Sequence, residues 1–162
     1  MNHTSIFRRA LSAFAVFALV ATTAACDNPV GQDDDHLEAR GVVITDMAGA
    51  MIAETHGDHW DFTSGSEIHL HPGKEMEVRV YFVDPAGNRF QVGSLTGYQL
   101  VVQVANPSIV TYGGHGDHGH FEALGTGETT AVIHLWHGNH PSGHADYSSP
   151  ALAIDVDGHG TH

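Results

Sequence analysis

The feature that most constrains the fold of this chain is the alternation of apolar and polar residues in short runs. In the segment 75–84, EMEVRVYFVD, the apolar face is formed by Met76, Val78, Val80 and Phe82. A period of two places successive side chains on opposite faces of a β-strand. No segment carries an apolar period of 3.6 residues for more than two turns, so the sequence predicts strands rather than long helices.

Runs of this kind recur along the chain, separated by Gly, Pro and Asn residues that favour turns. Strands are expected at 41–46, 51–55, 67–71, 75–84, 98–105, 108–112, 120–124, 129–136 and 151–156, the first two as a hairpin or a split first strand. The segment 113–119, GGHGDHG, is expected to be irregular because four of its seven residues are glycine. Seven or eight short strands predict an all-β fold, an antiparallel β-sandwich.

Several stretches resemble bacterial Ig-like domains of the group 2 type. The longest is 121–135, FEALGTGETTAVIHL, in which a short strand, a Gly-x-Gly turn and a Thr-rich alternating strand follow one another. The stretches 73–75 (GKE), 82–88 (FVDPAGN) and 106–110 (NPSIV) are also similar, so that the resemblance covers about residues 67–156. It implies an Ig-like sandwich, a fold that serves as adhesion module, spacer or binding platform. The histidine-rich loops are not part of that pattern.

The first 40 residues are expected to lie outside the folded domain. Two arginines precede a short apolar run and small residues, which is typical of a secretory signal at 1–25. The sequence Thr23-Ala-Ala-Cys26 resembles the lipobox of bacterial lipoproteins, with Thr23 where a branched aliphatic residue is usual. Cys26 is therefore the expected lipid attachment site, and a plain cleaved signal or a retained anchor is the alternative. This predicts a protein of the bacterial cell envelope, lipid-anchored, periplasmic or surface-exposed.

The expected domains follow from these boundaries. Residues 26–40 are interpreted as an acidic flexible tether, 41–157 as the Ig-like sandwich and 158–162 as a disordered tail. The run Asp33-Asp-Asp-His36 consists of residue types that can bind a metal, but a solvated linker is the favoured interpretation. From residue 26 onward there are 19 acidic and four basic residues, a net charge of −15 with neutral histidine, which excludes nucleic acid as a partner.

Histidine is strongly enriched, with 15 residues in 162. The unit His-Gly-(Asp/Asn)-His occurs at 56–59, 115–118 and 137–140. Because glycine and Asp or Asn favour turns, the two imidazoles of one unit can approach one ion. Ig-like topology predicts that all three units gather at one pole of the sandwich and share ions. The predicted metal ligands are His56, His59, His115, His118, His120, His137, His140 and His144.

Other residues are left open as ligands. Asp58, Asp117 and Asp146 are candidates for oxygen ligands or for acceptors that orient an imidazole. His69 and His71 stand two apart on one strand face, where they bind a metal or pair with nearby glutamates, and His134 faces away from the core. The tail histidines, His159 and His162, are expected at the opposite pole.

With its one cysteine acylated, the chain has no thiolate for a soft-metal site, and imidazoles with some carboxylate suit zinc, copper(II) or nickel(II). Zinc is favoured because four nitrogens match its tetrahedral preference. The expected function is non-enzymatic, without catalytic residues: capture or buffering of a divalent transition metal at the envelope, with a metal transporter as a partner. The alternatives are an adhesion module with pH-responsive histidines and a metalloenzyme resembling superoxide dismutase, whose disulfide this chain lacks.

Overall fold

The structure is a computed structural model that describes residues 36–115 and 118–157, with the side chain of Ser94 left out. It is an all-β sandwich of two sheets, as the sequence predicts, with one short 3-10 turn, η1 (Val92–Ser94). The predicted signal, Cys26, Asp117 and the tail lie outside the described residues. Within the described part, none of the helical structure is long and apolar enough to cross a membrane.

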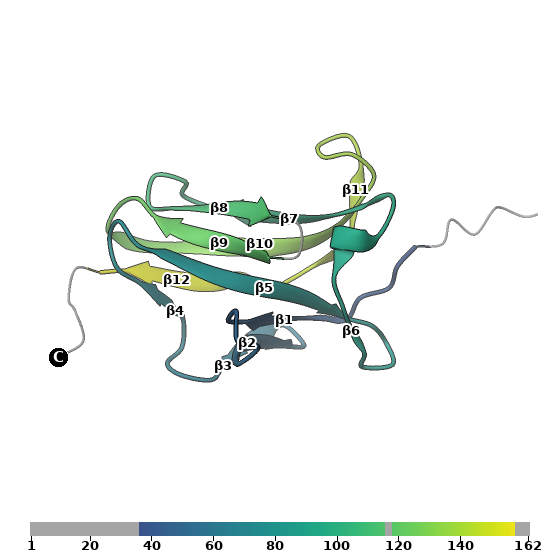
Figure 1. Cartoon of the computed structure of the whole chain (residues 1–162), viewed down its shortest axis with the longest axis horizontal. Helices are drawn as coiled ribbons and strands as arrows, with labels where there is room; N and C mark the ends of the chain where they lie inside the picture. The colour runs from purple at the N-terminus through teal and green to yellow at the C-terminus, as the bar shows by residue number, and fades with distance from the viewer. Residues whose placement is uncertain (1–35, 116–117, 158–162) are drawn as a thin grey trace, which may run out of the picture. The chain divides into compact units, whose positions relative to one another are not determined.

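The first sheet has seven strands, and β5 lies near its middle (Figure 1). Its order is β3 (His59–Phe62), β2 (Met51–His56), β1 (Gly41–Thr45), β5 (Glu75–Val83), β9 (His118–Ala123) and β8 (Val110–His115), and β6 (Arg89–Phe90) also pairs with β5. All of these pairs are antiparallel. Of the two alternatives for the first two strands, a hairpin or a split strand, the hairpin is confirmed.

The second sheet is built around its longest strand, β10 (Gly127–His137). One side of β10 pairs with β7 (Tyr98–Val104). The first half of β10 also pairs with β12 (Leu152–Val156) and its last four residues with β11 (His144–Ser148). β4 (Ile68–Leu70) adds to β12 in parallel, which is the one parallel pair among the described strands. The end of β10 is thus held between β7 and β11.

The alternation read from the sequence defines the core between the sheets. On β5, Val78, Val80 and Phe82 are buried, and on β10 the buried residues are Ala131, Ile133 and Leu135. All five residues of β1 are buried as well. Apolar burial of this kind is the main favourable term in folding, so the two alternating strands and β1 fix how the sheets pack.

The glycine-rich segment 113–119 differs from the expectation of irregular structure. Its described residues belong to β8 and β9, where Gly113 pairs with His120 and Gly114 with Gly119. A Cβ atom at Gly119 would overlap the ring of Tyr112, and one at Gly113 would lie 2.6 Å from the ring of His120. The glycines therefore make room for two rings that lie across the hairpin, which is compatible with extended strands.

Two further differences concern segments expected to be loops or tether. β3 and β11 fall in stretches expected to be turns. Residues 36–40, expected as part of the flexible tether, lie against the sandwich: Leu37 and Ala39 pack on the core, and the Leu37 amide donates to the Tyr98 hydroxyl at 2.8 Å. Residues 36–40 therefore pack as part of the sandwich in the described chain, although the sequence assigns them to the tether.

Candidate metal centre

Two of the predicted ligands, His137 and His144, form a cross-strand pair where β10 and β11 begin to separate. They are directly opposite each other in the antiparallel register, and their ring centroids are 5.3 Å apart. His137 continues the inward face of β10 beyond Leu135, by the period of two. The pair therefore stands at the open end of the core, and the hairpin connection 138–143 extends beyond it.

A β-bulge in β11 brings Asp146 to this pair. The register shifts between Leu135 and Trp136, so that Leu135 faces Tyr147 whereas Trp136 faces Ala145, and Asp146 has no residue directly opposite. A bulge of this kind redirects side chains, and bulges are frequent next to functional sites. Here it allows Tyr147 to pack against Phe82 while His144 and Asp146 both reach the end of the core. The Asp146 side chain is only 7% exposed.

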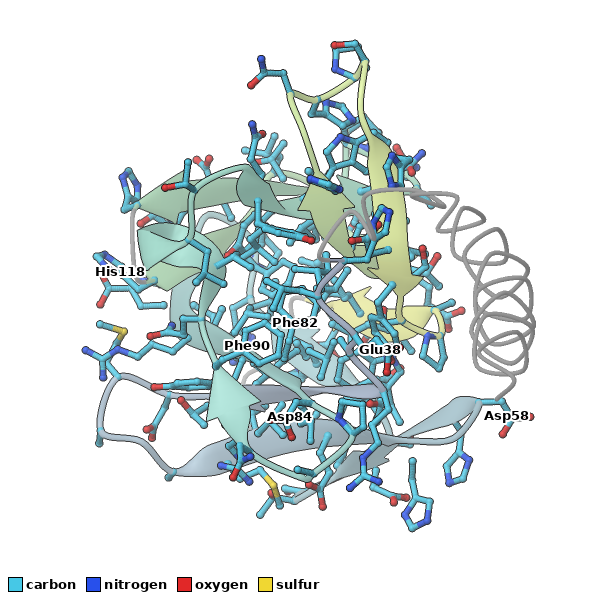
Figure 2. All side chains as sticks on the ribbon, turned by 90° about the vertical axis from the view of Figure 1, so that its right-hand side faces the viewer. Glu38, Asp58, Phe82, Asp84, Phe90 and His118 are labelled. Atoms are coloured by element: carbon cyan, nitrogen blue, oxygen red, sulfur yellow. The ribbon has the colours of Figure 1, made fainter. Side chains whose placement is uncertain are left out.

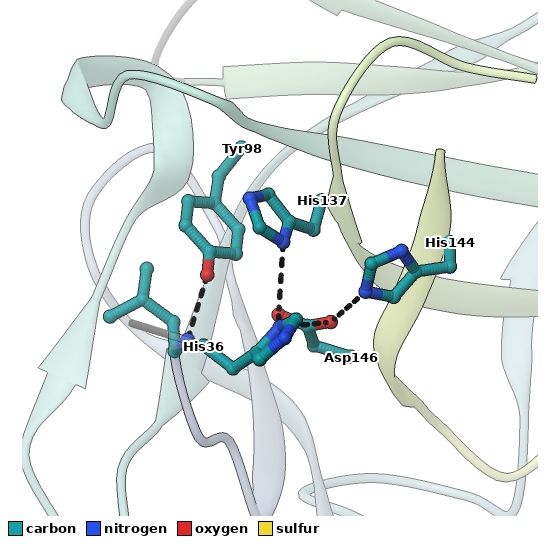
Figure 3. A network of polar contacts seen from close by, with 6 residues as sticks. His36, Tyr98, His137, His144 and Asp146 are labelled. Carbon is teal, nitrogen blue, oxygen red and sulfur yellow. Dashed lines mark hydrogen bonds and ion pairs between the residues drawn. The ribbon is translucent and has the colours of Figure 1, made fainter. Parts of the chain in front are cut away.

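The fourth member, His36, comes from the start of the described chain. Its Nδ1 atom lies 3.2 Å from each carboxylate oxygen of Asp146. Its ring centroid lies 5.1 Å from that of His137 and 5.4 Å from that of His144. The hydrogen bond from the Leu37 amide to Tyr98 holds this segment beside the hairpin (Figure 3).

The four side chains converge on a common point, as Figure 3 shows. Asp146 Oδ1 lies 3.0 Å from His144 Nε2, and Asp146 Oδ2 lies 4.0 Å from His137 Nδ1. One ligand atom from each of the four residues lies within 4.8 Å of every other. Bonds of ~2.0–2.1 Å at tetrahedral angles place neighbouring ligand atoms ~3.3–3.4 Å apart. Small side-chain movements therefore suffice to close this group around one ion.

His137 supplies an independent indication that the group accepts a ligand. Its Nδ1 atom is buried and has no hydrogen-bond partner among the residues that the structure describes. The ring is stacked on Tyr98, with centroids 4.7 Å apart and an interplanar angle of 10°. A buried nitrogen that makes no hydrogen bond costs free energy, even with the Asp146 carboxylate 4.0 Å away, and a metal ion at the centre of the group would satisfy it. Three imidazoles and one carboxylate are a donor set that zinc accepts.

The three His-Gly-x-His units do not meet at this centre. The ends of β2, β8 and β10 are all directed toward the end of the sandwich where β5 ends, as Ig-like topology predicts. The paired ends of β2 and β3 and those of β8 and β9 nevertheless lie at opposite edges of the first sheet, about four strand spacings or roughly 19 Å apart. Figure 2 shows this separation in the positions of Asp58 and His118, with the β10–β11 hairpin at a third corner.

The first unit is a small, exposed hairpin. The rings of His56 and His59 stack with centroids 5.8 Å apart, and their side chains are 80% and 60% exposed. Both rings face carboxylates, since His56 lies 3.5 Å from Asp61 and His59 lies 3.3 Å from Asp58. The hydrogen bond with His59 lowers the pKa of Asp58. Metal binding by His56 and His59 stays a prediction from the sequence.

The second unit is also local. The ring of His115 lies 5.7 Å from that of His118 and 5.1 Å from that of His120, which it stacks against. His115 and His118 line a groove between β7 and β8 together with His140 of the third unit, so these two units approach each other. Within 36–115 and 118–157, however, no metal-binding group joins one unit to another. Ligation by His115, His118, His120 and His140 stays a prediction.

His134 lies on the outer face of β10, three residues before the third unit begins at His137. Its Nδ1 atom lies 2.8 Å from the Ser148 hydroxyl, and its ring stands edge-on to Trp136, whose other neighbour is His140. Burial, with a smaller contribution from the charge of His140, lowers the pKa of His134. His134 therefore favours its neutral form and belongs to none of the described metal-binding groups.

The sequence predicts His137 and His144 as ligands and leaves Asp146 open, but it assigns His36 to a solvated linker. The spacing of 101 residues to His137 gives no local pattern that would pair them. The available signal was the pair Leu37 and Ala39, two apolar residues that the fold uses to dock this segment.

No protein-family model and no curated protein matches the chain. Among solved structures, domains 4 and 5 of the S-layer protein SbsC resemble it with a TM-score of 0.40 and 13% sequence identity. That alignment covers 57% of this chain and 48% of the S-layer chain, so the chain spans about half the length of the structure it matches.

Proposed function

We propose that this protein is a metal-binding domain tethered to the bacterial envelope, which captures or buffers a divalent transition metal, with zinc favoured. The observation that carries the proposal is the group His36, His137, His144 and Asp146, three imidazoles and a nearly buried carboxylate within 4.8 Å of one another. Histidine and aspartate clusters of this composition are able to hold a metal. Copper(II) and nickel(II) are the alternative ions.

The location of this group suits capture rather than catalysis. It lies at the mouth of a hairpin, where His36 and His144 are 45% and 61% exposed, so an ion can enter and leave. With a bound ion the four ligands would fill a tetrahedral shell, which is typical of zinc sites that hold an ion without activating water. No residue is therefore assigned a catalytic role.

Calorimetric titration of residues 26–162 with zinc, copper(II) and nickel(II) at neutral pH tests the proposal. The expected result is binding with a Kd well below ~100 µM, or more favourable than about −5.5 kcal/mol. His137→Ala and His144→Ala are expected to weaken binding strongly, and the pair His56→Ala and His59→Ala serves as a control that leaves the four-ligand centre intact. Wild-type binding weaker than ~100 µM for all three ions would overturn the proposal.

The envelope location is part of the same proposal and rests on the N-terminal sequence. Expression of the full chain in a bacterium with labelled fatty acid should label the protein, and Cys26→Ser should abolish the label. A labelled serine variant would overturn Cys26 as the attachment site, and an unlabelled wild type that is exported would mean that the protein has no lipid anchor.

A further inference from the structure

A second group of histidine and aspartate side chains lies at the other end of the sandwich. His69 is the central residue of β4 and His71 follows that strand, so both project from the outward face. On the neighbouring parallel strand, Asp155 lies directly opposite His69, and Asp157 follows two residues later. The sheet register therefore brings two imidazoles and two carboxylates onto one patch, where β4 and β12 end side by side (Figure 1).

The ring atoms of His69 are oriented by both carboxylates. Its Nδ1 atom lies 3.5 Å from Asp155 Oδ2, and its Nε2 atom lies 3.0 Å from Asp157 Oδ1. In metal sites a ligating histidine commonly donates one ring N–H to a carboxylate or carbonyl, which fixes the tautomer and leaves the other nitrogen for the metal. Asp155 is placed to receive that N–H, and Asp157 is placed to share an ion with Nε2.

His71 shows the same arrangement with a backbone acceptor. Its Nδ1 atom lies 3.4 Å from the carbonyl oxygen of Asp157, which leaves Nε2 as the nitrogen with a lone pair for a metal. The rings of His69 and His71 stand edge to face with centroids 5.4 Å apart. One ligand atom each from His69, His71 and Asp157 lies within 4.8 Å of the other two.

We propose that His69, His71 and Asp157 form a second site for zinc or a similar divalent transition ion, with Asp155 as the residue that positions His69. Three protein ligands leave one position of a tetrahedral ion for water or an incoming ligand. The side chains of His69 and Asp157 are 38% and 36% exposed, which keeps that position accessible. This site would therefore hold its ion less tightly and exchange it faster than the four-ligand centre.

The two sites are too far apart to share an ion. β10 has 11 residues; its first pairs with the C-terminal end of β12, and its last is His137 itself. At ~3.3 Å per residue, the two groups are separated by roughly 30 Å. The second site is thus independent of the proposed function of the first.

Calorimetric titration of residues 26–162 with zinc, together with variants of each site, tests this inference. The wild type is expected to show two binding events of different affinity. The double variant His69→Ala and His71→Ala should lose the weaker event alone, whereas His137→Ala with His144→Ala should lose the tighter event alone. Asp155→Asn should weaken the weaker event by about 10- to 100-fold while keeping its stoichiometry.

Zinc titration of the wild type, followed by NMR of the imidazole signals, gives an answer that needs no folded variant. Signals of His69 and His71 should shift at the higher zinc concentrations, after those of His137 and His144. Unshifted His69 and His71 signals would overturn the second site and mean that the cluster is only a network of ion pairs. Unshifted His137 and His144 signals would instead overturn the first site, so the two failures are distinguishable.

Discussion

Zinc should stabilise the fold through the four-ligand centre, because its ligands come from segments that are far apart in the sequence. An ion bound there joins His36 to the β10–β11 hairpin, and unfolding separates them. A ligand that binds only the folded state at 100 times its Kd adds ~2.7 kcal/mol of stability. For a domain of about this size, at roughly 3–5 °C per kcal/mol, the melting temperature should rise by roughly 8–14 °C.

Removing one ligand gives the quantitative test. Loss of residues that only orient a ligand costs 10- to 100-fold in affinity, so loss of the His137 imidazole should cost at least ~100-fold. At the same zinc concentration the stabilisation then falls to RT ln 2, about 0.4 kcal/mol. His137→Ala should therefore melt only about 1–2 °C higher with zinc than without it.

The assay is a thermal melt followed by tryptophan fluorescence or circular dichroism, with zinc and with chelator. All proteins should carry His69→Ala and His71→Ala, so that the second proposed site does not contribute. The matched control adds His56→Ala and His59→Ala, two exposed histidines at another corner of the sandwich, and should keep the full shift. A full shift in His137→Ala, or its loss in the control, would refute the reasoning.

Three further predictions concern the sandwich itself. Phe82 is fully buried, so Phe82→Ala should lower the free energy of unfolding by ~3–5 kcal/mol in urea titration, and a loss below ~1 kcal/mol would contradict its place in the core. A Cβ atom at Gly119 would overlap the Tyr112 ring whereas one at Gly114 would lie 3.8 Å from it, so Gly119→Ala should cost ~1–3 kcal/mol more than the control Gly114→Ala, and equal costs would refute the packing. Burial raises the pKa of Tyr112 to about 12, so the unfolded chain ionises first as pH rises above ~10 and stability is lost between pH ~10 and ~12. Tyr112→Phe should remove part of that alkaline loss and, because the buried hydroxyl has no hydrogen-bond partner in the described chain, should not reduce stability at pH 7; a destabilised variant would show a missed partner.

Much of the fold could be predicted from the sequence, because alternation reports burial directly. In β5 and β10, buried residues alternate with more exposed ones, as the sequence predicts. Turn-forming residues mark the ends of most of the other strands. For residues 113–115 and 118–119 the prediction of irregular structure is wrong, because glycine composition favours irregular structure while the space under Tyr112 and His120 requires glycine in a strand. Such a requirement depends on contacts across the hairpin, which composition does not reveal.

The metal centre could be predicted only in part. The repeat pattern pointed to His137, and His144 is its neighbour in the hairpin. The repeat itself is local, however: His56 stacks on His59, and His115 lies beside His118. Asp146 reaches the centre because the β10–β11 register shifts by one residue. His36 reaches it because its segment, 101 residues before His137, docks beside the hairpin. Neither position follows a periodic pattern in the sequence.

The most direct test of the central claim is a crystal of residues 26–162 grown with zinc and measured on both sides of the zinc absorption edge. The account predicts an anomalous peak ~2.0–2.1 Å from ring nitrogens of His36, His137 and His144 and from a carboxylate oxygen of Asp146. Zinc found only at the turns 56–59 or 115–118, with none among these four side chains, would contradict it.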